Sequence, residues 1–458
     1  MKIAVCIRQG LDGEISPFDA CAYEEALKID GAEITLISMG APPVADFLLK
    51  LTRLGAKNAI LLSDKAFAGA DTLATAYALS LAIKKLSPDL VFCGRQTLVG
   101  DTAQTPVMLA QLLGYGLITN VMSIDCIGAD AIECTTRCEG AEKTQIPALI
   151  TVERINTLRL PRLRSKLGEV EVWNAQEIGA DVSKCGLTGS PTRVLRTFEN
   201  QSGKRKCTFI SRKELKWAIE EGLRRNAERV NDSTESTGEK LEKVFIVGEA
   251  PRAFASTVSD SVTDIGFDDA DAIAEIIRSQ DPDAVIWGSD TRSKRLSSQV
   301  AAILGLGLCA DCTRLECSDG ELIMYRPALS GSIIAKIKSL TRPAMATVRT
   351  DSGDAARIMI GVGFGAKDRL LDIGELAREL GAEICASRKL VDNGYASYER
   401  QVGLTGKTVS PPVYVAAGIS GAVHHIVGME RAGTVIAINT DRNAPIFDYA
   451  DFGIVDEF

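Results

Sequence analysis

The feature that most constrains this chain is an internal repeat. Three blocks of the first half return in the same order in the second half. They are "SPDLVFCG" at 87–94 and "DPDAVIWG" at 281–288, "LAQLLGYGL" at 109–117 and "VAAILGLGL" at 300–308, and "PALITVER" at 147–154 and "PAMATVRT" at 343–350. Three matched blocks in one order indicate duplication of a whole structural unit. The chain is therefore predicted to contain two copies of one fold.

Each copy reads as an α/β unit. The short apolar runs at 2–7, 33–39 and 58–63 are typical of buried parallel strands, and residues 72–86 have helical spacing. Such alternation predicts a doubly wound sheet with helices on both faces. Between the copies, "RVNDSTESTGEKLEK" is polar and poor in apolar residues, which suits a surface linker.

A third α/β unit follows the second copy. Four strand-like runs, "RIMIGVGFG", "AEICAS", "VYVAAGIS" and "TVIAIN", alternate with helical patterns. The predicted fold class is thus α/β, with two related doubly wound domains and a nucleotide-fold-like domain at the C-terminus. The predicted limits are 1–228 for the first domain, 229–242 for the linker, 243–350 for the second domain and 351–458 for the third.

Composition narrows the classes of function. The chain has 458 residues, of which 46% are hydrophobic and 24% charged, as in soluble globular proteins of two to four domains. Its net charge of -8 argues against nucleic acid as a main partner. No run of about 18 apolar residues and no export signal are evident, so a cytoplasmic protein without a membrane span is expected.

The twelve cysteines are scattered along the chain, and we expect reduced thiols rather than disulfides. Cys309, Cys312 and Cys317 raise the alternative of an iron–sulfur or zinc site. However, no second CxxC pair and no histidine lie near them, whereas such sites usually need four ligands. No metal is therefore predicted.

A candidate binding segment lies in the third unit. "PVYVAAGIS" reads as a strand and "GAVHHIVGM" as a helix, which places Gly418, Ser420 and Gly421 on the turn between them. The backbone N–H groups at the start of a helix suit a phosphate. The pattern departs from GxGxxG, and a tight turn without a ligand explains it equally well at this point.

Two other segments support a ligand. "QVGLTGK" is a glycine-rich turn that carries Thr405 and Lys407, and "CASRKLVD" puts Ser387 and Arg388 just after a strand. In an open parallel sheet, ligands bind beyond the carboxyl ends of the strands. The three segments are expected to converge on one crevice, and together they indicate a dinucleotide site.

The only two histidines, His424 and His425, lie next to each other in the predicted helix. Neighbours on a helix point about 100° apart, so the two rings are not expected to share one role. At a helix N-terminus the neutral imidazole is favoured. Two ordinary, partly buried histidines are the alternative.

The quoted blocks resemble electron transfer flavoprotein, a two-subunit FAD carrier that relays electrons from dehydrogenases. Residues 1–228 resemble its β subunit, through "GRQTLVGDTAQ" and "GLTGSPTRV". Residues 243–458 resemble its α subunit, through "LCADCTRLE", "YRPALSGSIIAKI", "QVGLTGKTVSPPVYVAAGISGAVHH" and "AINTDRNAPIFDYADFGIV". The chain is therefore similar to a fusion of the two subunits, with the β-like half first.

The resemblance implies an FAD in the third domain and roles for individual residues. Arg388 matches the arginine over the flavin ring, Thr405 the threonine that hydrogen-bonds flavin N5, and His425 the histidine at the O2 side. Donors and positive charge there stabilise the reduced, anionic flavin. The other matched positions that line the FAD are Ser387, Gln401, Gly403, Gly406, Gly418, Ser420, Gly421 and Asn439.

The resemblance also implies a second nucleotide in the first domain. "GRQTLVGDTAQT" matches a loop where classical members bind AMP and electron-bifurcating members bind a second FAD. Ala103 stands where AMP-only members tend to carry Asn, which favours the second FAD. The corresponding segment of the second copy, "DTRSKRLSSQ", lacks the Gly-Asp-Thr pattern, so only the first copy is expected to bind. The matched residues are Cys6, Gly100, Asp101, Thr102, Ala103, Gln104 and Thr105.

The chain also departs from the family pattern. Phe364 replaces a common arginine, and Leu404 and His424 replace common glutamines, which puts the flavin potential and hence bifurcation in question. The segment 156–166, "NTLRLPRLRSK", matches the family's docking segment for dehydrogenases, although a solvated loop is the alternative.

The predicted function is that of a soluble, FAD-containing electron carrier. The expected donor is a flavin-linked dehydrogenase, such as an acyl-CoA dehydrogenase of fatty acid β-oxidation, or NADH. The expected acceptor is another oxidoreductase or ferredoxin, and only a bifurcating protein would oxidise NADH as an enzyme. A classical carrier with one FAD and one AMP is the alternative. A non-redox nucleotide-binding scaffold fits less well, because it needs none of Arg388, Thr405 and His425.

Overall fold

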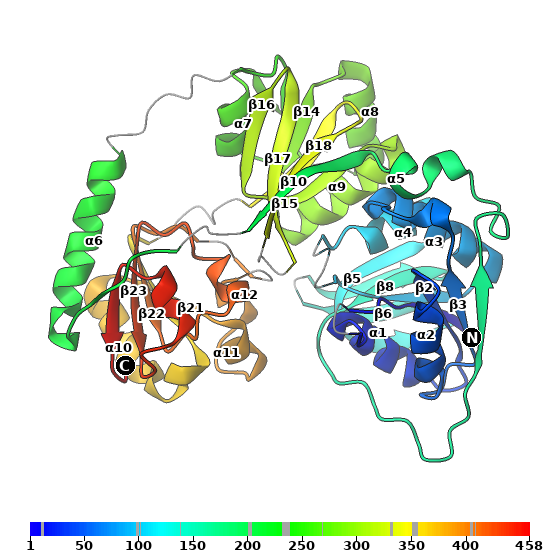
Figure 1. Cartoon of the computed structure of the whole chain (residues 1–458), viewed down its shortest axis with the longest axis horizontal. Helices are drawn as coiled ribbons and strands as arrows, with labels where there is room; N and C mark the ends of the chain where they lie inside the picture. Colours follow the sequence, from blue (N-terminus) through cyan, green and yellow to red (C-terminus); the bar gives the residue numbers. More distant parts are fainter. Residues whose placement is uncertain are drawn as a thin grey trace. The chain divides into compact units, whose positions relative to one another are not determined.

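The computed structural model describes residues 1–10, 13–97, 100, 102–137, 139–199, 204–230, 239–267, 269–329, 333–349, 356–403, 406–407 and 409–458. Asp101, Leu404 and Thr405, which the sequence singled out, lie outside the described residues. The chain forms two compact units, each described by itself (Figure 1). The first holds Met1–Arg196, Glu239–Leu329 and Ala335–Val348, and the second holds Thr197–Gly238, Ser330–Ile334 and Arg349–Phe458.

The first copy of the repeat is built on a nine-stranded sheet in the order β7-β6-β5-β8-β4-β1-β2-β3-β9. Its parallel strands are apolar runs buried between helices on both faces. The strands are β1 (Lys2–Cys6), β2 (Glu33–Met39), β3 (Asn58–Leu62), β4 (Leu90–Gly94), β5 (Gly116–Ile127), β6 (Ala131–Thr136), β7 (Gly140–Gln145), β8 (Ala148–Val152) and β9 (Glu169–Trp173). The helices are α1 (Pro17–Leu27), α2 (Val44–Thr52), α3 (Thr72–Leu86), α4 (Thr105–Leu113) and α5 (Gly186–Gly189).

The second copy has a five-stranded parallel sheet in the order β13-β12-β14-β19-β15. Read from its other edge, this order repeats β5-β8-β4-β1-β2 of the first copy. The strands are β12 (Val244–Val247), β13 (Val262–Asp264), β14 (Ala284–Trp287), β15 (Leu308–Cys312) and β19 (Ala344–Val348), and the helices are α7 (Arg252–Val258), α8 (Ala270–Gln280) and α9 (Thr291–Leu304).

Local geometry repeats as well. Asn120 on β5 and Asp311 on β15 both have left-handed backbones, with φ of 59° and 54°. Their N–H groups donate to equivalent threonines, to Thr151 Oγ1 at 2.9 Å and to Thr347 Oγ1 at 2.8 Å. The predicted duplication is confirmed by strand order and by these matched bonds.

The segment after the first copy joins other sheets. β10 (Thr192–Glu199) pairs with β18 (Ile333–Ser339) in the four-stranded sheet β10-β18-β17-β16, which also holds β16 (Arg314–Ser318) and β17 (Glu321–Ala328). β11 (Thr208–Phe209) pairs with β24 (Phe452–Val455), and α6 (Leu215–Val230) packs on β22 (Val413–Ala417) and β23 (Thr434–Asn439). The structure thus groups residues 204–230 with the C-terminal unit, whereas the sequence assigned them to the first domain up to residue 228.

The C-terminal sheet is parallel, in the order β11-β24-β23-β22-β20-β21. Its remaining strands are β20 (Ile358–Val362), β21 (Glu383–Ala386), β22 (Val413–Ala417), β23 (Thr434–Asn439) and β24 (Phe452–Val455), and its helices are α10 (Leu370–Leu380), α11 (Arg388–Asp392) and α12 (Val423–Ile426). The chain runs from β20 outward to β21 and then back to β22 on the other side. The crevice expected at such a reversal lies between the carboxyl ends of β20 and β22.

One predicted element is shorter than expected. The helix read from "GAVHHIVGM" is only the four-residue α12, which ends ahead of Gly428. In the described part of the chain, no helix is long and apolar enough to span a membrane.

Candidate cofactor sites

The carboxyl edge of the C-terminal sheet gathers the segments singled out in the sequence. Ser387 follows β21 and Gly418 follows β22. The glycine-rich turn is tied to this edge, because Val402 N donates to Ala386 O at 2.9 Å and Lys407 N donates to Gln401 O at 2.7 Å. The described parts of the three segments therefore lie together, as predicted.

The glycines of this edge are explained by backbone packing. Gly418 and Gly421 have φ of 63° and 92°, a region that favours glycine. A Cβ on Gly418 would lie 2.5 Å from Ala366 N, and one on Gly421 would lie 2.1 Å from Ile446 N. Since α12 has only four residues, the argument for a phosphate at a helix N-terminus does not hold for this turn.

Other predicted residues of this edge are packed against, or hydrogen-bonded to, the protein's own backbone. A Cβ on Gly403 or Gly406 would meet a backbone carbonyl, that of His424 or of Gln401. Ser420 is exposed, and its carbonyl accepts from Ile446 N at 3.2 Å. Asn439 Nδ2 donates to Ile419 O at 2.9 Å, so this amide fixes the turn after β22.

The two histidines have different environments, as their geometry predicted. His424 is exposed and His425 is buried. His425 Nε2 lies 2.9 Å from the hydroxyl of Tyr414, which is itself buried. Burial lowers the pKa of His425 to about 4, against a smaller opposing effect of the Val402 backbone. The imidazole is therefore neutral at pH 7.

Two predicted residues of the C-terminal sheet edge carry buried polar atoms without a hydrogen-bond partner in the described part of the chain, Ser387 Oγ and His425 Nδ1. Buried polar atoms in proteins are nearly always paired. Arg388, the first residue of α11, supplies a positive charge on the same edge and pairs with Asp392 at 3.2 Å. A hydroxyl, an imidazole nitrogen and a guanidinium at one sheet edge fit a polar cofactor with anionic character.

Phe364, at the position where an arginine was expected, directly follows β20 and Gly363. Its ring contacts Tyr395 edge-on, and the Lys389 ammonium lies 4.7 Å from its centroid. Two further cations are nearby. Lys367 lies three residues after Phe364 and also contacts its ring, and Arg388 belongs to α11, the helix that carries Lys389.

In the first copy, the strand order predicts a crevice between the carboxyl ends of β1 and β4. The Asp19 carboxylate bridges both ends, because it accepts from Arg8 N at 2.8 Å and from Gly94 N at 3.2 Å. Burial raises the pKa of Asp19 to about 7, although these two bonds and the Arg8 charge lower it. Sequence reasoning missed this residue, whose only signal was an acidic side chain in the first turn of a helix.

Residues 100–105 precede and open α4. Gln104 is buried, and its side chain makes no cap to the helix; its Oε1 accepts from Thr72 Oγ1 at 3.1 Å. Its Nε2 has no partner among the described residues. Thr102 Oγ1 lies 3.5 Å from Gln104 N, and Ala103 has a left-handed backbone with φ of 55°. Thr105 is the first residue of α4.

Cys6 and Gly100, two further predicted residues, each make a contact inside the first unit. The half-buried Cys6 thiol, at the end of β1, lies next to the Cys93 thiol, and this contact together with burial raises the pKa of Cys93. Gly100 O accepts from Arg326 Nη2 at 3.0 Å. Because Arg326 belongs to the second copy, that copy contacts the first at Gly100, which sequence blocks alone did not reveal.

Comparison with known proteins decides the family. Residues 3–178 and 261–362 match the family described as electron transfer flavoprotein domain. Residues 354–430 match the family described as electron transfer flavoprotein FAD-binding domain. The chain belongs to the electron transfer flavoprotein family. It carries both domains in one polypeptide, as the resemblance to a β–α fusion predicted.

Individual relatives match the flavoprotein over parts of its length. Protein FixA of Azorhizobium caulinodans is 40% identical over 224 residues, which are 44% of this chain and 79% of FixA. Protein FixB of Bradyrhizobium diazoefficiens is 37% identical over 233 residues, 41% of this chain and 63% of FixB. The electron transfer flavoprotein subunit alpha of Thermoanaerobacterium thermosaccharolyticum is 36% identical over 232 residues, 41% of this chain and 70% of that subunit. The match to FixB thus covers less than two thirds of that relative.

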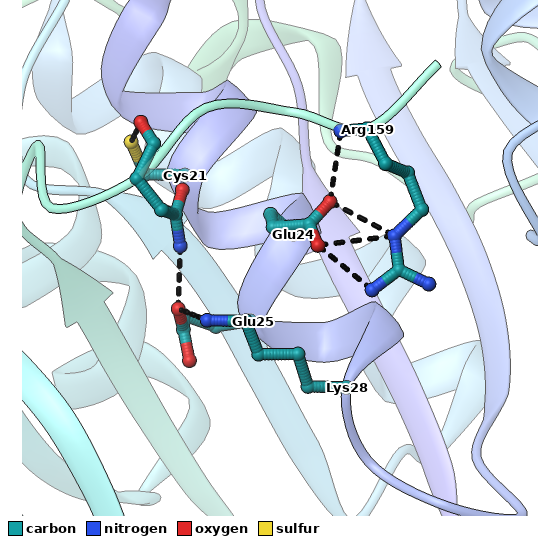
Figure 2. A network of polar contacts seen from close by, with 6 residues as sticks. Cys21, Glu24, Glu25, Lys28 and Arg159 are labelled. Carbon is teal, nitrogen blue, oxygen red and sulfur yellow. Dashed lines mark hydrogen bonds and ion pairs between the residues drawn. The ribbon is translucent and has the colours of Figure 1, made fainter. Parts of the chain in front are cut away.

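One surface segment of the flavoprotein, residues 156–168, lies between β8 and β9. Leu160 and Leu163 are 87% and 100% exposed. The segment is held at its start, because Arg159 Nη2 pairs with Glu24 Oε1 at 2.7 Å and Arg159 N donates to Glu24 Oε2 at 3.0 Å (Figure 2). Asn156 Nδ2 donates to Glu25 Oε1 on the same helix, α1. The leucines are therefore presented from an anchored base.

Proposed function

We propose that this flavoprotein carries electrons between an oxidoreductase donor and an oxidoreductase acceptor, with FAD held at the carboxyl edge of its C-terminal sheet. The observation that carries the proposal is the pair of unpartnered buried atoms, Ser387 Oγ and His425 Nδ1, inside the region that matches an FAD-binding domain. When bound, FAD supplies the one- and two-electron chemistry that amino acid side chains lack.

The chain's own residues bind FAD and favour its reduced form. The Arg388 guanidinium places a fixed positive charge on the edge, and the Ser387 hydroxyl offers a hydrogen bond. Thr405 and Gln401 are assigned by the family resemblance, which gives Thr405 the hydrogen bond to flavin N5. Fixed donors and a positive charge stabilise the anion that forms on reduction, and so raise the potential.

A second nucleotide is proposed for the first copy, bound by Cys6 and residues 100–105. The uncapped start of α4 and the unpartnered Gln104 Nε2 support it. Ala103 favours a second FAD over AMP, because AMP-only members tend to carry Asn at its position. With two flavins, NADH would be an electron donor and the protein would bifurcate electrons. The alternative is a classical carrier with one FAD and one AMP.

The donor is proposed to be a flavin-linked dehydrogenase, such as an acyl-CoA dehydrogenase, that docks on residues 156–166. Its support is the pair of exposed leucines beside exposed basic residues, Arg162 and Arg164. An apolar pair with a basic rim suits an acidic partner surface with a hydrophobic pocket.

The deciding experiment counts nucleotides per chain. The purified protein is denatured, and released FAD and AMP are separated and quantified. Two FAD per chain without AMP is the expected result. One FAD with one AMP per chain would instead identify the protein as a classical, non-bifurcating carrier. A colourless protein that does not take up FAD on reconstitution would overturn the electron-carrier proposal. Steady oxidation of NADH coupled to a low-potential acceptor then tests bifurcation.

A further inference from the structure

A buried row of three polar side chains runs beside the FAD edge. Cys385, on β21, lies 3.4 Å from the Tyr414 hydroxyl, on β22, measured from its Sγ atom. The same hydroxyl lies 2.9 Å from His425 Nε2. All three residues are buried, with exposed fractions of 2%, 0% and 6%. Water therefore does not compete for these contacts.

The middle strand of the sheet makes room for this row. β20 lies between β21 and β22, and its Gly361 pairs with Cys385 on one side and Ala416 on the other. A Cβ on Gly361 would lie 1.9 Å from the Tyr414 hydroxyl oxygen. The phenol thus crosses β20 at a residue without a side chain, so its position is fixed by the sheet.

The row allows two arrangements of protons. In one, Tyr414 O–H donates to His425 Nε2 and accepts from the Cys385 thiol, and the imidazole proton sits on Nδ1. In the other, Nε2–H donates to the Tyr414 oxygen and Tyr414 O–H donates to sulfur, which is a weak acceptor. The first arrangement is therefore preferred.

We infer that Tyr414 is a positioning residue that holds His425 in its Nδ1–H tautomer, so that the imidazole offers an N–H donor at the FAD edge. The atom that carries this proton is Nδ1, which has no partner among the described residues. With the opposite tautomer, a lone pair at Nδ1 would repel a reduced, anionic flavin. The tautomer itself needs no cofactor, whereas its effect on FAD rests on the proposed function.

The test uses the fact that the chain has only two histidines. The full-length protein carrying His424→Gln is labelled with ¹⁵N-histidine, which leaves one imidazole in a long-range ¹H–¹⁵N spectrum. A protonated Nδ1 and an unprotonated Nε2 are expected. Adding Tyr414→Phe removes the donor to Nε2, and the two nitrogens should then move toward averaged or exchanged shifts. Cys385→Ala, the matched control, should leave the tautomer unchanged.

Two results would overturn the inference: a protonated Nε2 in the parent spectrum, or a spectrum that Tyr414→Phe leaves unaltered. Circular dichroism verifies that the Phe variant, which lacks one oxygen atom, is folded. In FAD-loaded protein, the same variant should lose about tenfold in its preference for reduced over oxidised FAD, as expected for one hydrogen bond to a charged group. If no FAD binds, the proposed function fails while the tautomer result stands.

Discussion

The two copies of the α/β unit share a strand order but differ at one helix start. In the first copy, α4 begins after Gln104, whose side chain does not cap the helix. In the second copy, α9 begins after Asp290, whose carboxylate accepts from Ser293 N at 2.9 Å and from Ser293 Oγ at 2.5 Å. The same position in the fold thus holds a helix start without a side-chain cap in one copy and an acidic cap in the other.

The N–H groups at a helix start can be paired with a side-chain cap, which stabilises the helix, or with a bound anion. Asp290 satisfies a helix donor, and its negative charge excludes a phosphate. The buried Gln104 makes no side-chain cap to α4, and its amide Nε2 has no partner in the described part of the chain. The two copies are therefore proposed to have different roles. The second copy contacts the loop of the first through Arg326, and only the first is proposed to bind an anionic nucleotide.

The largest expected effect is the pH dependence of the first crevice. The pKa of Asp19 is raised to about 7, so the folded state keeps a proton that the unfolded state releases near pH 4. Stability should then fall as pH rises through this window, by up to about 4 kcal/mol. Urea unfolding of Asp19→Asn at several pH values should show a flatter dependence than the parent.

The second copy offers the control for this prediction. The half-buried Asp264 accepts from Gly248 N at 3.0 Å after β12, the counterpart of β1. Asp264→Asn removes a carboxylate of the second copy without touching Asp19, so the slope that it gives is compared with that of Asp19→Asn. If the parent and Asp19→Asn show equal slopes of stability against pH, Asp19 is ionised throughout this range. Its carboxylate would then only accept hydrogen bonds from the two strand ends.

Grafting the cap of the second copy onto the first should exchange their properties. Gln104→Asp places a carboxylate at the start of α4, which should stabilise the helix by about 1 kcal/mol. The same charge should weaken the binding of an anionic nucleotide in the first copy by about tenfold, through repulsion of its phosphate. Nucleotide content after denaturation measures the loss, and Gln104→Asn is the neutral control. An unchanged content in the Asp variant would place the phosphate elsewhere.

Removing the cap from the second copy tests the other half of the comparison. Asp290→Ala leaves Ser293 N without its acceptor and should cost about 1 kcal/mol of stability. Nucleotide content should stay that of the parent, because this helix start faces no expected ligand. A shift in the urea midpoint without a change in the m-value is the measurement. An added nucleotide in this variant would show that the acidic cap alone had suppressed binding.

The sequence revealed the architecture far better than the contacts inside it. The repeated blocks contain β4, β8 and their counterparts. Such strands can be recognised in the sequence because a buried strand is apolar regardless of which residues it packs against. Periodicity does not say which strands are neighbours, so Asp19 and Tyr414 were missed: each acts across adjacent strands that are distant in sequence. Arg326 was missed because it acts between the copies. The length of α12 was overestimated because the spacing of Ala422, Ile426 and Met429 suits a helix, but the chain turns at Gly428.

The smallest expected effect concerns a segment that only the first copy has. After β8 the chain continues through residues 156–168 to β9, whereas among the described residues no such strand follows β19 in the second copy's sheet. Glu24→Gln removes the charge that pairs with Arg159, a partly exposed pair, and should cost about 0.5 kcal/mol of stability or less.

Glu24→Gln also releases the base of the exposed leucines. A dehydrogenase partner should therefore bind about threefold more weakly, because more chain must be ordered on docking. Titration calorimetry with an acyl-CoA dehydrogenase compares Glu24→Gln with Glu33→Gln, which breaks an exposed pair with Lys57 on the same domain. Equal affinities for the two variants would mean that the anchor does not preorganise the segment.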